Sequence, residues 1–323
     1  MSKDYAIGID LGGTNVKMGL VKKGSRILKR KVLNTGDYPS RRALIKAMID
    51  TSGDFLRSSK LKANQVAGIG VGVPGPVNFE EGIIYTLTNI KGWNNVELEK
   101  IFEEKLKIKT YLDNDVNVIA VGEHIYGAGT GVDNLICITL GTGVGGALII
   151  NGKIYRGANF VAGEIGHVPI NIKGPVCACG AVACLERYVG NRYIVERAKR
   201  AARRKKKSLL SKLVKGDMSK ITPELITKAA RKNDSLARSI WQEAGLYIGT
   251  ALSGVVNLLN PEMIIIGGGI SKAGNVLLEP IRQTVKKRSM ASSLKGLKIV
   301  SARLGEDAGL IGAATLATLG KDA

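Results

Sequence analysis

Apolar and polar residues alternate along the first part of the chain, and short glycine-containing turns interrupt the alternation. A two-residue period is typical of strands, so it predicts strands over Tyr5–Leu11, Val16–Lys22 and Arg26–Leu33. From Arg41 to about Ser58 the apolar positions instead recur every three or four residues, which predicts a helix. The apolar run Val66–Val73 then predicts a buried strand.

A similar order of elements recurs in outline in the second half. Strands are predicted at Thr110–Leu112, Leu135–Leu140, Ala147–Ile150, Lys153–Tyr155, 263–267 and Lys298–Ala302, and helices from about 115 to Val121, over much of 186–258 with a break near 215–221, and at Val276–Lys287 and Leu310–Leu319. Two such units predict an α/β protein with two similar lobes facing a cleft. A length of 323 residues also favours two domains. We place a small lobe at 1–120 with the C-terminal helix (about 308–323), and a large lobe with a helical insertion at 121–307.

No apolar run approaches the roughly 18 residues that a membrane-spanning helix needs. The N-terminus, MSKDYAIGID, lacks the apolar core of a signal peptide. We therefore expect a soluble, cytoplasmic protein that does not bind a membrane.

The chain is strongly basic, with 48 Lys and Arg against 27 Asp and Glu and a formal net charge of +21. Residues 192–215 alone hold eleven Lys or Arg and one acid, Glu196. Apolar residues interleave with these charges, which favours surface helices with a solvated basic side. A general attraction for anionic substrates such as ATP is the second interpretation. We expect no specific nucleic-acid partner, because no helix-turn-helix, zinc finger or aromatic-basic RNA motif accompanies the charge.

The first glycine-rich turn has the residues of a phosphate site. A strand ends at Asp10-Leu11, Gly12-Gly13 let the backbone come close to a ligand, and Thr14-Asn15-Val16-Lys17 begins the next strand. Backbone N–H groups, the Thr14 hydroxyl and Lys17 could bind phosphates, and Asp10 could hold Mg²⁺ directly or through water. An ordinary hairpin would leave these polar residues unexplained.

A second glycine-rich turn, Gly141-Thr142-Gly143-Val144-Gly145-Gly146, contains the spacing G-x-G-x-x-G. The dinucleotide-binding fingerprint needs a helix after this loop. Here a strand-like segment follows, so the Rossmann interpretation fails. Two phosphate-type hairpins in two similar lobes fit a nucleoside triphosphate better.

The turn Asp113-Asn114-Asp115 follows a strand and precedes a helix. Asp115 could be a general base that accepts a proton from a substrate hydroxyl, and Asn114 could orient that hydroxyl. Alternatively, Asp115 is the N-cap of the helix. The two roles are compatible.

Three of the four cysteines form a Cys-x-Cys-x4-Cys run at Cys177, Cys179 and Cys184, and His167 lies ten residues before it. In a cytosolic protein such clustering indicates a metal rather than disulfides. One His and three thiolates suit a closed, tetrahedral and therefore structural Zn²⁺ site. The fourth cysteine, Cys137, lies in an apolar run and is expected to be a buried thiol.

We call the segment 167–184, which carries the four zinc ligands, the zinc loop. It would present three side chains to the hydroxyls of a sugar: Glu164, His167 and Glu186. A further glycine run, Gly267-Gly268-Gly269, ends the strand 263–267. Backbone approach to an adenine or its ribose at Gly268 is the functional interpretation. A tight strand-to-helix turn is the alternative, and this motif alone is weakly specific.

Together these residues resemble the ROK family (repressor, open reading frame, kinase), in particular its sugar kinases of the bacterial glucokinase type. The resemblance runs from about Ala6 to Gly312. Its most specific parts are Glu-x-Gly-His at 164–167 and Cys-x-Cys-Gly-x3-Cys-x-Glu at 177–186. It implies the two-lobed actin/hexokinase-like (RNase H-like) fold with an interlobe cleft, and a homodimer.

The resemblance also implies roles for individual residues. Asp115 matches the catalytic base. The sugar ligands are matched by Asn114, Glu164, His167 and Glu186, with Gly75 lining the same pocket; the zinc ligands are matched by His167, Cys177, Cys179 and Cys184. Three residues depart from the family pattern. Ala183 stands where Gly is common and tolerates a positive φ less well. Ala147 follows Gly145-Gly146 where a third glycine is common, and Phe160 stands where smaller residues are frequent.

The function implied is ATP-dependent phosphorylation of a hexose, glucose to glucose 6-phosphate, in glycolysis. Mannose, fructose, N-acetylglucosamine and N-acetylmannosamine are alternative substrates, and polyphosphate or ADP alternative donors. A repressor of the same family carries a DNA-binding domain before the first phosphate motif, whereas only nine residues precede Asp10 here. A sugar-sensing protein without catalysis would lack the base or the phosphate residues, so we expect an enzyme.

Overall fold

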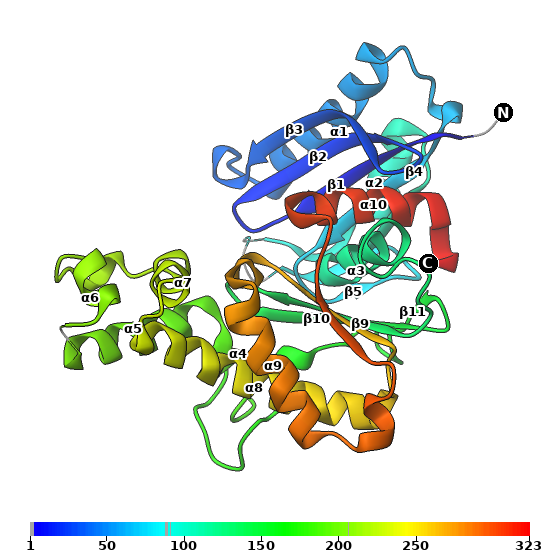
Figure 1. Cartoon of the computed structure of the whole chain (residues 1–323). Helices are drawn as coiled ribbons and strands as arrows, with labels where there is room; N and C mark the ends of the chain where they lie inside the picture. Colours follow the sequence, from blue (N-terminus) through cyan, green and yellow to red (C-terminus); the bar gives the residue numbers. More distant parts are fainter. Residues whose placement is uncertain (1–2, 88–89, 91, 206) are drawn as a thin grey trace. The chain divides into compact units, whose positions relative to one another are not determined.

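The computed structural model describes residues 3–87, 90, 92–205 and 207–323. The chain divides into two compact units (Figure 1). Unit 1 comprises Met1–Asp133, Ala147–Gly163 and Ala302–Ala323; unit 2 comprises Asn134–Gly146 and Glu164–Ser301. No helix among the described residues is long and apolar enough to cross a bilayer.

Unit 1 is built on a five-stranded sheet in the order β3-β2-β1-β4-β8. Its strands are β1 (Tyr5–Leu11), β2 (Asn15–Lys22), β3 (Arg26–Asn34), β4 (Val66–Val73) and β8 (Thr110–Asn114). The first three pair antiparallel, and β1, β4 and β8 run parallel. These strands confirm the predicted ones, with ends that differ by one or two residues.

The two faces of this sheet bury different side chains, because successive residues of a strand point to opposite sides. Ile7, Ile9 and Leu11 of β1 share a core with the apolar stripe of α1 (Arg41–Ser58). Ala6 of β1 instead shares a cluster with Leu310 and Ala314 of α10 (Ala308–Leu319).

Glycines let α10 come close to the sheet. A Cβ at Gly8 would lie 2.1 Å from the Leu310 carbonyl oxygen, and one at Gly70 would lie 1.8 Å from that of Ala313. The alternation of glycine with Ile and Val in β4 therefore provides one face for α1 and one for α10. Because Asp10 follows Gly8 at the same two-residue spacing, its side chain points toward the α10 side.

Unit 1 also holds elements that the sequence pattern did not predict. A three-stranded sheet is formed by β5 (Val77–Asn78), β6 (Ile83–Thr86) and β7 (Asn94–Glu97), and α2 (Leu98–Leu106) follows it. The helix predicted from about 115 to Val121 is confirmed as α3 (Asp115–Tyr126), which extends five residues further. Its Val118 carbonyl lies only 1.9 Å from where a Cβ at Gly312 would be.

A second five-stranded sheet has the order β11-β10-β9-β12-β13. Its strands are β9 (Leu135–Leu140), β10 (Val144–Ile150), β11 (Lys153–Ile154), β12 (Met263–Gly267) and β13 (Lys298–Ser301). β12 runs parallel to β9 and β13, whereas β10 and β11 form an antiparallel hairpin. Cys137 is fully buried in β9, as expected.

The helices of unit 2 are α4 (Glu186–Val189), α5 (Asn191–Arg204), α6 (Leu209–Leu213), α7 (Pro223–Arg231), α8 (Ser235–Leu259) and α9 (Asn275–Arg288). The predicted break near 215–221 corresponds to the segment between α6 and α7, which contains the 3-10 turn Met218–Lys220. Short 3-10 turns lie at Thr35–Asp37, Ala63–Gln65, Ile165–His167 (η3), Met218–Lys220, Gly269–Ala273 (η5), Ala291–Leu294, Gly305–Asp307 and Gly320–Asp322.

Candidate functional site

The Asp10 turn of unit 1 is a hairpin tip between β1 and β2. Gly12 N donates to the Asn15 carbonyl at 2.9 Å, and Asp10 and Lys17 are cross-strand partners. The Thr35 hydroxyl donates to the carbonyls of Gly13 and Thr14 at 2.8 and 2.9 Å, so it fixes the tip from outside. Thr35 had no signal in the sequence that connected it to this turn.

The Asp10 carboxylate lies at the start of α10. A Cβ at Gly309 would lie 2.6 Å from its Oδ2, so only glycine leaves the space that the carboxylate occupies. Burial raises the pKa of Asp10, and the charge of Lys17 opposes that rise. The Lys17 ammonium itself donates to the Glu306 carbonyl at 3.3 Å. A buried carboxylate of this kind could hold a cation, which would replace the lost water.

The Asn114–Asp115 turn joins β8 to α3. The Asn114 Oδ1 accepts hydrogen bonds from the N–H groups of Val116 and Asn117, at 2.8 and 3.4 Å, so Asn114 is the N-cap of α3. The interpretation of Asp115 as the N-cap is therefore wrong: Asp115 is the first helical residue. Its half-buried side chain accepts from the Val116 N–H at 2.9 Å.

Gly75 lies beside this turn, because the Asn114 Nδ2 donates to the Gly75 carbonyl at 3.4 Å. Gly75 has a φ of 145°, and a Cβ there would lie 2.6 Å from the Thr86 carbonyl oxygen. No other residue fits this backbone without a shift of β6. The structure thus brings Gly75, Asn114 and Asp115 together within unit 1.

Behind the turn, Asp113 is fully buried and forms a two-hydrogen-bond ion pair with Arg156, at 3.0 and 2.9 Å. Burial raises the pKa of Asp113, and the nearby charge of Arg156 opposes that rise. Sequence reasoning missed Arg156, since 43 residues separate the two and neither is part of a spacing motif.

In unit 2, the second glycine-rich turn contacts a predicted sugar ligand. The Glu186 Oε2 accepts a hydrogen bond from the Val144 N–H at 3.0 Å, and a Cβ at Gly143 would lie 2.4 Å from the same oxygen. Thr142 next to it is exposed. The turn leads into a strand rather than a helix, which confirms the exclusion of the dinucleotide fingerprint.

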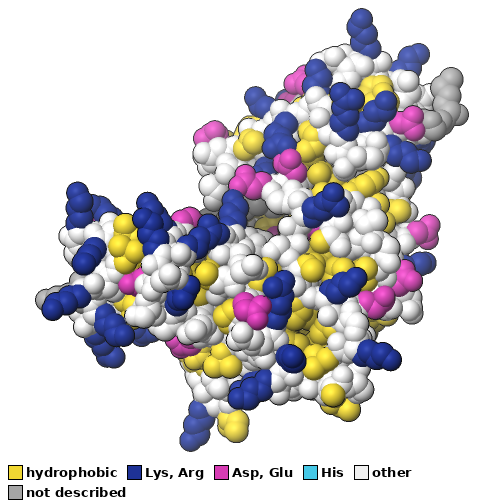
Figure 2. Space-filling view, viewed as in Figure 1, with side chains coloured by type: hydrophobic (Ala, Val, Ile, Leu, Met, Phe, Trp, Pro, Cys, Tyr) yellow, Lys and Arg dark blue, Asp and Glu magenta, His cyan; other side chains and the backbone are white. Residues whose placement is uncertain are grey.

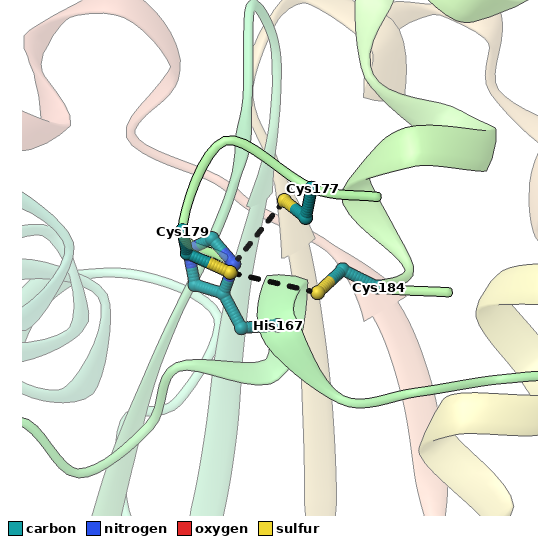
Figure 3. Close-up of side chains that lie close together, drawn as sticks. All are labelled: His167, Cys177, Cys179 and Cys184. Carbon is teal, nitrogen blue, oxygen red and sulfur yellow. Dashed lines mark hydrogen bonds between the residues drawn. The ribbon is translucent and has the colours of Figure 1, made fainter. Parts of the chain in front are cut away.

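The Cys3His cluster is assembled as predicted (Figure 3). Its ligand atoms all lie within 4.8 Å of one another, with 3.8 Å between Cys177 Sγ and His167 Nδ1 and 3.7 Å between the Sγ atoms of Cys179 and Cys184. Ligand atoms about 2.1–2.3 Å from one tetrahedral Zn²⁺ are separated by about 3.5–3.8 Å. The donor set and its spacing therefore fit zinc.

The loop that carries the cluster has a strained residue. Ala183 has a φ of 60°, in the left-handed region that favours glycine. Its N–H donates to the Pro175 carbonyl and its own carbonyl accepts from the Ile170 N–H, both at 3.0 Å. The backbone of Ala183 is therefore hydrogen-bonded to two earlier parts of the same loop. Phe160, the other departure from the family pattern, also has a positive φ, of 59°.

His167, in η3, lies beside Cys177 of the metal cluster and beside the carboxylate of Glu164. With Nδ1 toward Cys177, its Nε2 lies 3.9 Å from the Glu164 carboxylate. Burial raises the pKa of Glu164; the charge of His167 opposes the rise and that of Glu186 adds to it. The structure thus brings Glu164, His167 and Glu186 together within unit 2.

Gly268 follows β12 at a φ of 85°, with a Cβ position only 2.3 Å from the Leu140 carbonyl oxygen. The next residues, Gly269 and Ile270, line a pocket of about 450 Å³ between η5 and α7. Its rim carries the cationic side chains of Lys228, Arg231, Lys232 and Lys272. A planar, apolar ring with an anionic substituent would suit such a pocket.

A family model described as the ROK family matches residues 6–319. This chain belongs to the ROK family. The glucokinase of Halalkalibacterium halodurans is 36% identical over 313 residues, which cover 97% of this chain and 94% of that protein. A crystal structure of a ROK glucokinase from Streptomyces griseus, in complex with glucose and AMPPNP, is 32% identical with a TM-score of 0.82; the match covers 98% of this chain and 100% of that one. The predicted fold of the actin/hexokinase type is confirmed by these ROK structures.

The ROK relatives also include regulators. The xylose repressor of Caldicellulosiruptor bescii is 31% identical over 316 residues, which cover 95% of this chain and 76% of the repressor. Relatives named as kinases and relatives named as repressors therefore both match this chain over nearly its whole length, so the fold alone does not decide between the two functions.

Proposed function

We propose that this chain is a glucokinase that transfers the γ-phosphoryl group of ATP to the 6-hydroxyl of glucose. The observation that carries the proposal is the match, over nearly the whole chain, to a ROK glucokinase bound to glucose and AMPPNP. The assembled Asn114–Asp115 turn and the Glu164, His167 and Glu186 group support it.

Asp115 is the general base. A carboxylate within hydrogen-bond reach of the sugar hydroxyl takes its proton as the oxygen attacks the γ-phosphorus, and the β–γ bridging bond breaks to release ADP. Because the transition state of phosphoryl transfer is loose, positioning and charge stabilisation contribute more than base strength. The cap formed by Asn114 and the first turn of α3 fix the backbone that carries Asp115.

Glu164, His167 and Glu186 bind the sugar hydroxyls, together with Asn114 and Gly75. With Nδ1 of His167 on the metal side, its Nε2 is the atom that remains for a hydroxyl. Glu186 is already oriented by the Val144 N–H. Carboxylates held in this way accept hydrogen bonds from adjacent hydroxyls in a fixed geometry.

The nucleotide is bound by the two glycine-rich turns and the pocket beside Gly268. Gly12, Gly13, Thr14, Asn15 and Lys17 line the first turn, Thr142 and Gly143 belong to the second, and the adenosine occupies the pocket between η5 and α7. Asp10 holds Mg²⁺ directly or through water. The ion neutralises phosphate charge when it is bound.

Zinc is held by His167, Cys177, Cys179 and Cys184 and is structural, since four protein ligands close its coordination shell. We also infer a cytoplasmic homodimer. Support for a partner surface comes from the exposed apolar side chains of Ile172 and Val176 near the zinc loop, which are 100% and 66% exposed. Light scattering of the purified protein tests the dimer.

The first experiment measures ADP formation with MgATP and, separately, glucose, mannose, fructose, N-acetylglucosamine or N-acetylmannosamine. We expect turnover with glucose, and a loss of about 10²–10⁴-fold in kcat in Asp115→Ala. Asp115→Asn is the isosteric control, which keeps the Val116 contact but cannot accept the proton. Turnover with a different sugar would correct the substrate.

The alternative function is sugar sensing, as in the repressors among the ROK relatives. Folded, zinc-loaded protein that binds glucose in calorimetry but turns over none of the five sugars would contradict the kinase and favour this alternative.

A further inference from the structure

Arg156 makes three kinds of contact inside unit 1, although it lies in the loop that follows the edge strand β11. Its Nε and Nη2 donate to the Asp113 Oδ2 at 3.0 and 2.9 Å. Its Nη1 donates to the backbone oxygen of Ala323 at 3.2 Å, and its Cζ lies 3.5 Å from the centre of the Phe79 ring. The side chain is only 11% exposed, so protein atoms surround most of the guanidinium.

The other oxygen of Asp113 continues this chain of contacts to the proposed catalytic turn. Oδ1 accepts hydrogen bonds from the Asn114 N–H and from the Asn117 Nδ2, both at 2.8 Å. Asn114 precedes Asp115, and Asn117 lies in the first turn of α3. The Asp113 carboxylate therefore binds the backbone before Asp115 and the Asn117 side chain after it, and Arg156 binds that carboxylate.

Arg156 also anchors the loop on which it lies. Its carbonyl accepts a hydrogen bond from the Ala162 N–H at 2.9 Å, which closes the loop 156–162. The loop contains Phe160 at a φ of 59°, a conformation that persists only where the surroundings determine it. The backbone of Arg156 thus closes this loop, while its guanidinium contacts the carboxylate that precedes the Asn114–Asp115 turn.

We propose that Arg156 is a positioning residue for Asp115, acting through the buried carboxylate of Asp113. The inference rests on the proposed function of Asp115. Two N–H groups of the planar guanidinium converge on the single oxygen Oδ2 and leave Oδ1 to the Asn114 N–H and the Asn117 side chain. A rigid pair of donors fixes the position of that oxygen more closely than a single ammonium group does. A shift of about 1 Å in a catalytic group can cost about 10²-fold in rate.

The test compares Arg156→Lys with a matched variant, Arg30→Lys. Arg30 also pairs with an aspartate of unit 1, Asp307 at 2.6 Å, but both members of that pair are partly exposed and neither touches the Asp115 turn. We expect Arg156→Lys to fold, to keep KM for glucose within about threefold, and to lose about 10–100-fold in kcat. Arg30→Lys keeps both constants.

A double-mutant cycle separates positioning from general stability. If Arg156 acts through Asp113, Asp113→Asn lowers kcat by a similar factor, and the double variant loses little more than either single one. A kcat within twofold of the wild type in folded Arg156→Lys, or kcat losses that add in the double variant, would overturn the proposal.

Amide hydrogen exchange gives a readout that does not depend on glucose phosphorylation. We expect the amides of residues 114–117 to exchange faster in Arg156→Lys and at the wild-type rate in Arg30→Lys. Unchanged exchange at these amides would overturn the positioning role. A wild type inactive on all five sugars would instead overturn the proposed function, and the exchange result would still show whether Arg156 orders the turn.

Discussion

At the scale of single residues, Gly143 and Gly141 occupy the same turn but have different surroundings. A Cβ at Gly143 would lie 2.4 Å from the Glu186 Oε2, whereas a Cβ at Gly141 would have no atom within 4 Å. Neither glycine has a positive φ, so an alanine at either position brings no backbone strain. The two positions therefore separate the effect on Glu186 from the effect on the turn.

We expect Gly143→Ala to displace the Glu186 carboxylate and to raise KM for glucose about tenfold, the effect of one lost hydrogen bond to a charged group. Gly141→Ala should keep the wild-type KM. Initial rates at varied glucose and saturating MgATP measure both. Equal values in the two variants would show that Glu186 does not bind the sugar.

The sequence identified most of these residues individually but not their partners. Asp115, Glu164 and His167 stand in short motifs, so their chemistry could be interpreted from spacing. Arg156 and Thr35 act through side chains that reach a turn far away in the sequence, and no local pattern signals such a contact. The cap of α3 was assigned one residue too late, because Asn114 and Asp115 are both good N-caps and only backbone geometry distinguishes them.

At the scale of elements, the zinc loop depends on four ligands in about twenty residues. Cys184→Ser should remove one ligand, lower the zinc content measured by mass spectrometry, and speed amide exchange in residues 168–184, since little else there is buried. KM for glucose should rise, because His167 loses its fixed orientation.

Cys137→Ala is the matched control for the zinc loop, since it removes the fourth cysteine from buried β9. It should keep the zinc and the exchange pattern of residues 168–184. Full zinc occupancy in Cys184→Ser would contradict the assigned ligand set.

A carboxylate of α2, that of Glu99, accepts a hydrogen bond from the backbone of the edge strand β8. The Glu99 Oε1 accepts from the Leu112 N–H at 2.7 Å, and burial raises the pKa of Glu99 from 4.5 to about 7, although that N–H opposes the rise. The folded state then binds more protons than the unfolded state between pH 4.5 and 7. The contribution of Glu99 to stability is complete below this window and is lost as pH rises through about 7.

Glu99→Gln keeps the acceptor oxygen and removes the titration. We expect its melting temperature to exceed that of the wild type at pH 8, and the difference to shrink toward pH 4. Thermal melts across this range measure it. Glu104→Gln, on the exposed side of the same helix, should show no such trend; the same trend in both variants would refute the assignment to Glu99.

Long, periodic elements could be predicted from the sequence, whereas short ones could not. The strands β1 to β4 and the helix α1 have clear patterns over seven or more residues. The strands β5, β6 and β7 have two to four residues each, which is too few to show a period, and tertiary contacts such as the burial of Trp93 stabilise them.

At the scale of the whole molecule, much of the +21 charge lies over α5 and the segments after it, where Figure 2 shows many Lys and Arg side chains. The buried face of α5 consists of Ile194, Ala198 and Ala202, and four of its cations are exposed: Arg192, Arg200, Arg203 and Arg204. Arg197 instead pairs with Glu243 of α8. Arg200, Arg204 and Lys205 are exposed and, within the described residues, form no salt bridge. The expected surface helices of residues 192–215 correspond to α5 and α6, and most of their cations belong to α5 and the segment after it.

This surface should bind nucleic acid without sequence preference and with a steep salt dependence. Replacing Arg200, Arg204 and Lys205 with Gln should reduce the slope of log K against log salt by about 2–3 for a DNA duplex, at unchanged kcat. Replacing the exposed Lys286, Lys287 and Arg288 of α9 removes the same charge elsewhere. Equal slopes in the two triple variants would show that net charge alone determines the binding.

The close fit of α10 against β1 and β4 has a consequence for synthesis of the protein. Gly8 and Gly70 leave room for α10, a helix that begins 300 residues after Gly8. All the residues between Gly8 and α10 leave the ribosome before that helix does. Until α10 emerges, one face of the sheet of unit 1 lacks the helix that packs on it. The nascent chain therefore carries an incomplete core while the residues between β1 and α10 are made, and α10 completes the core of unit 1 only after its own synthesis.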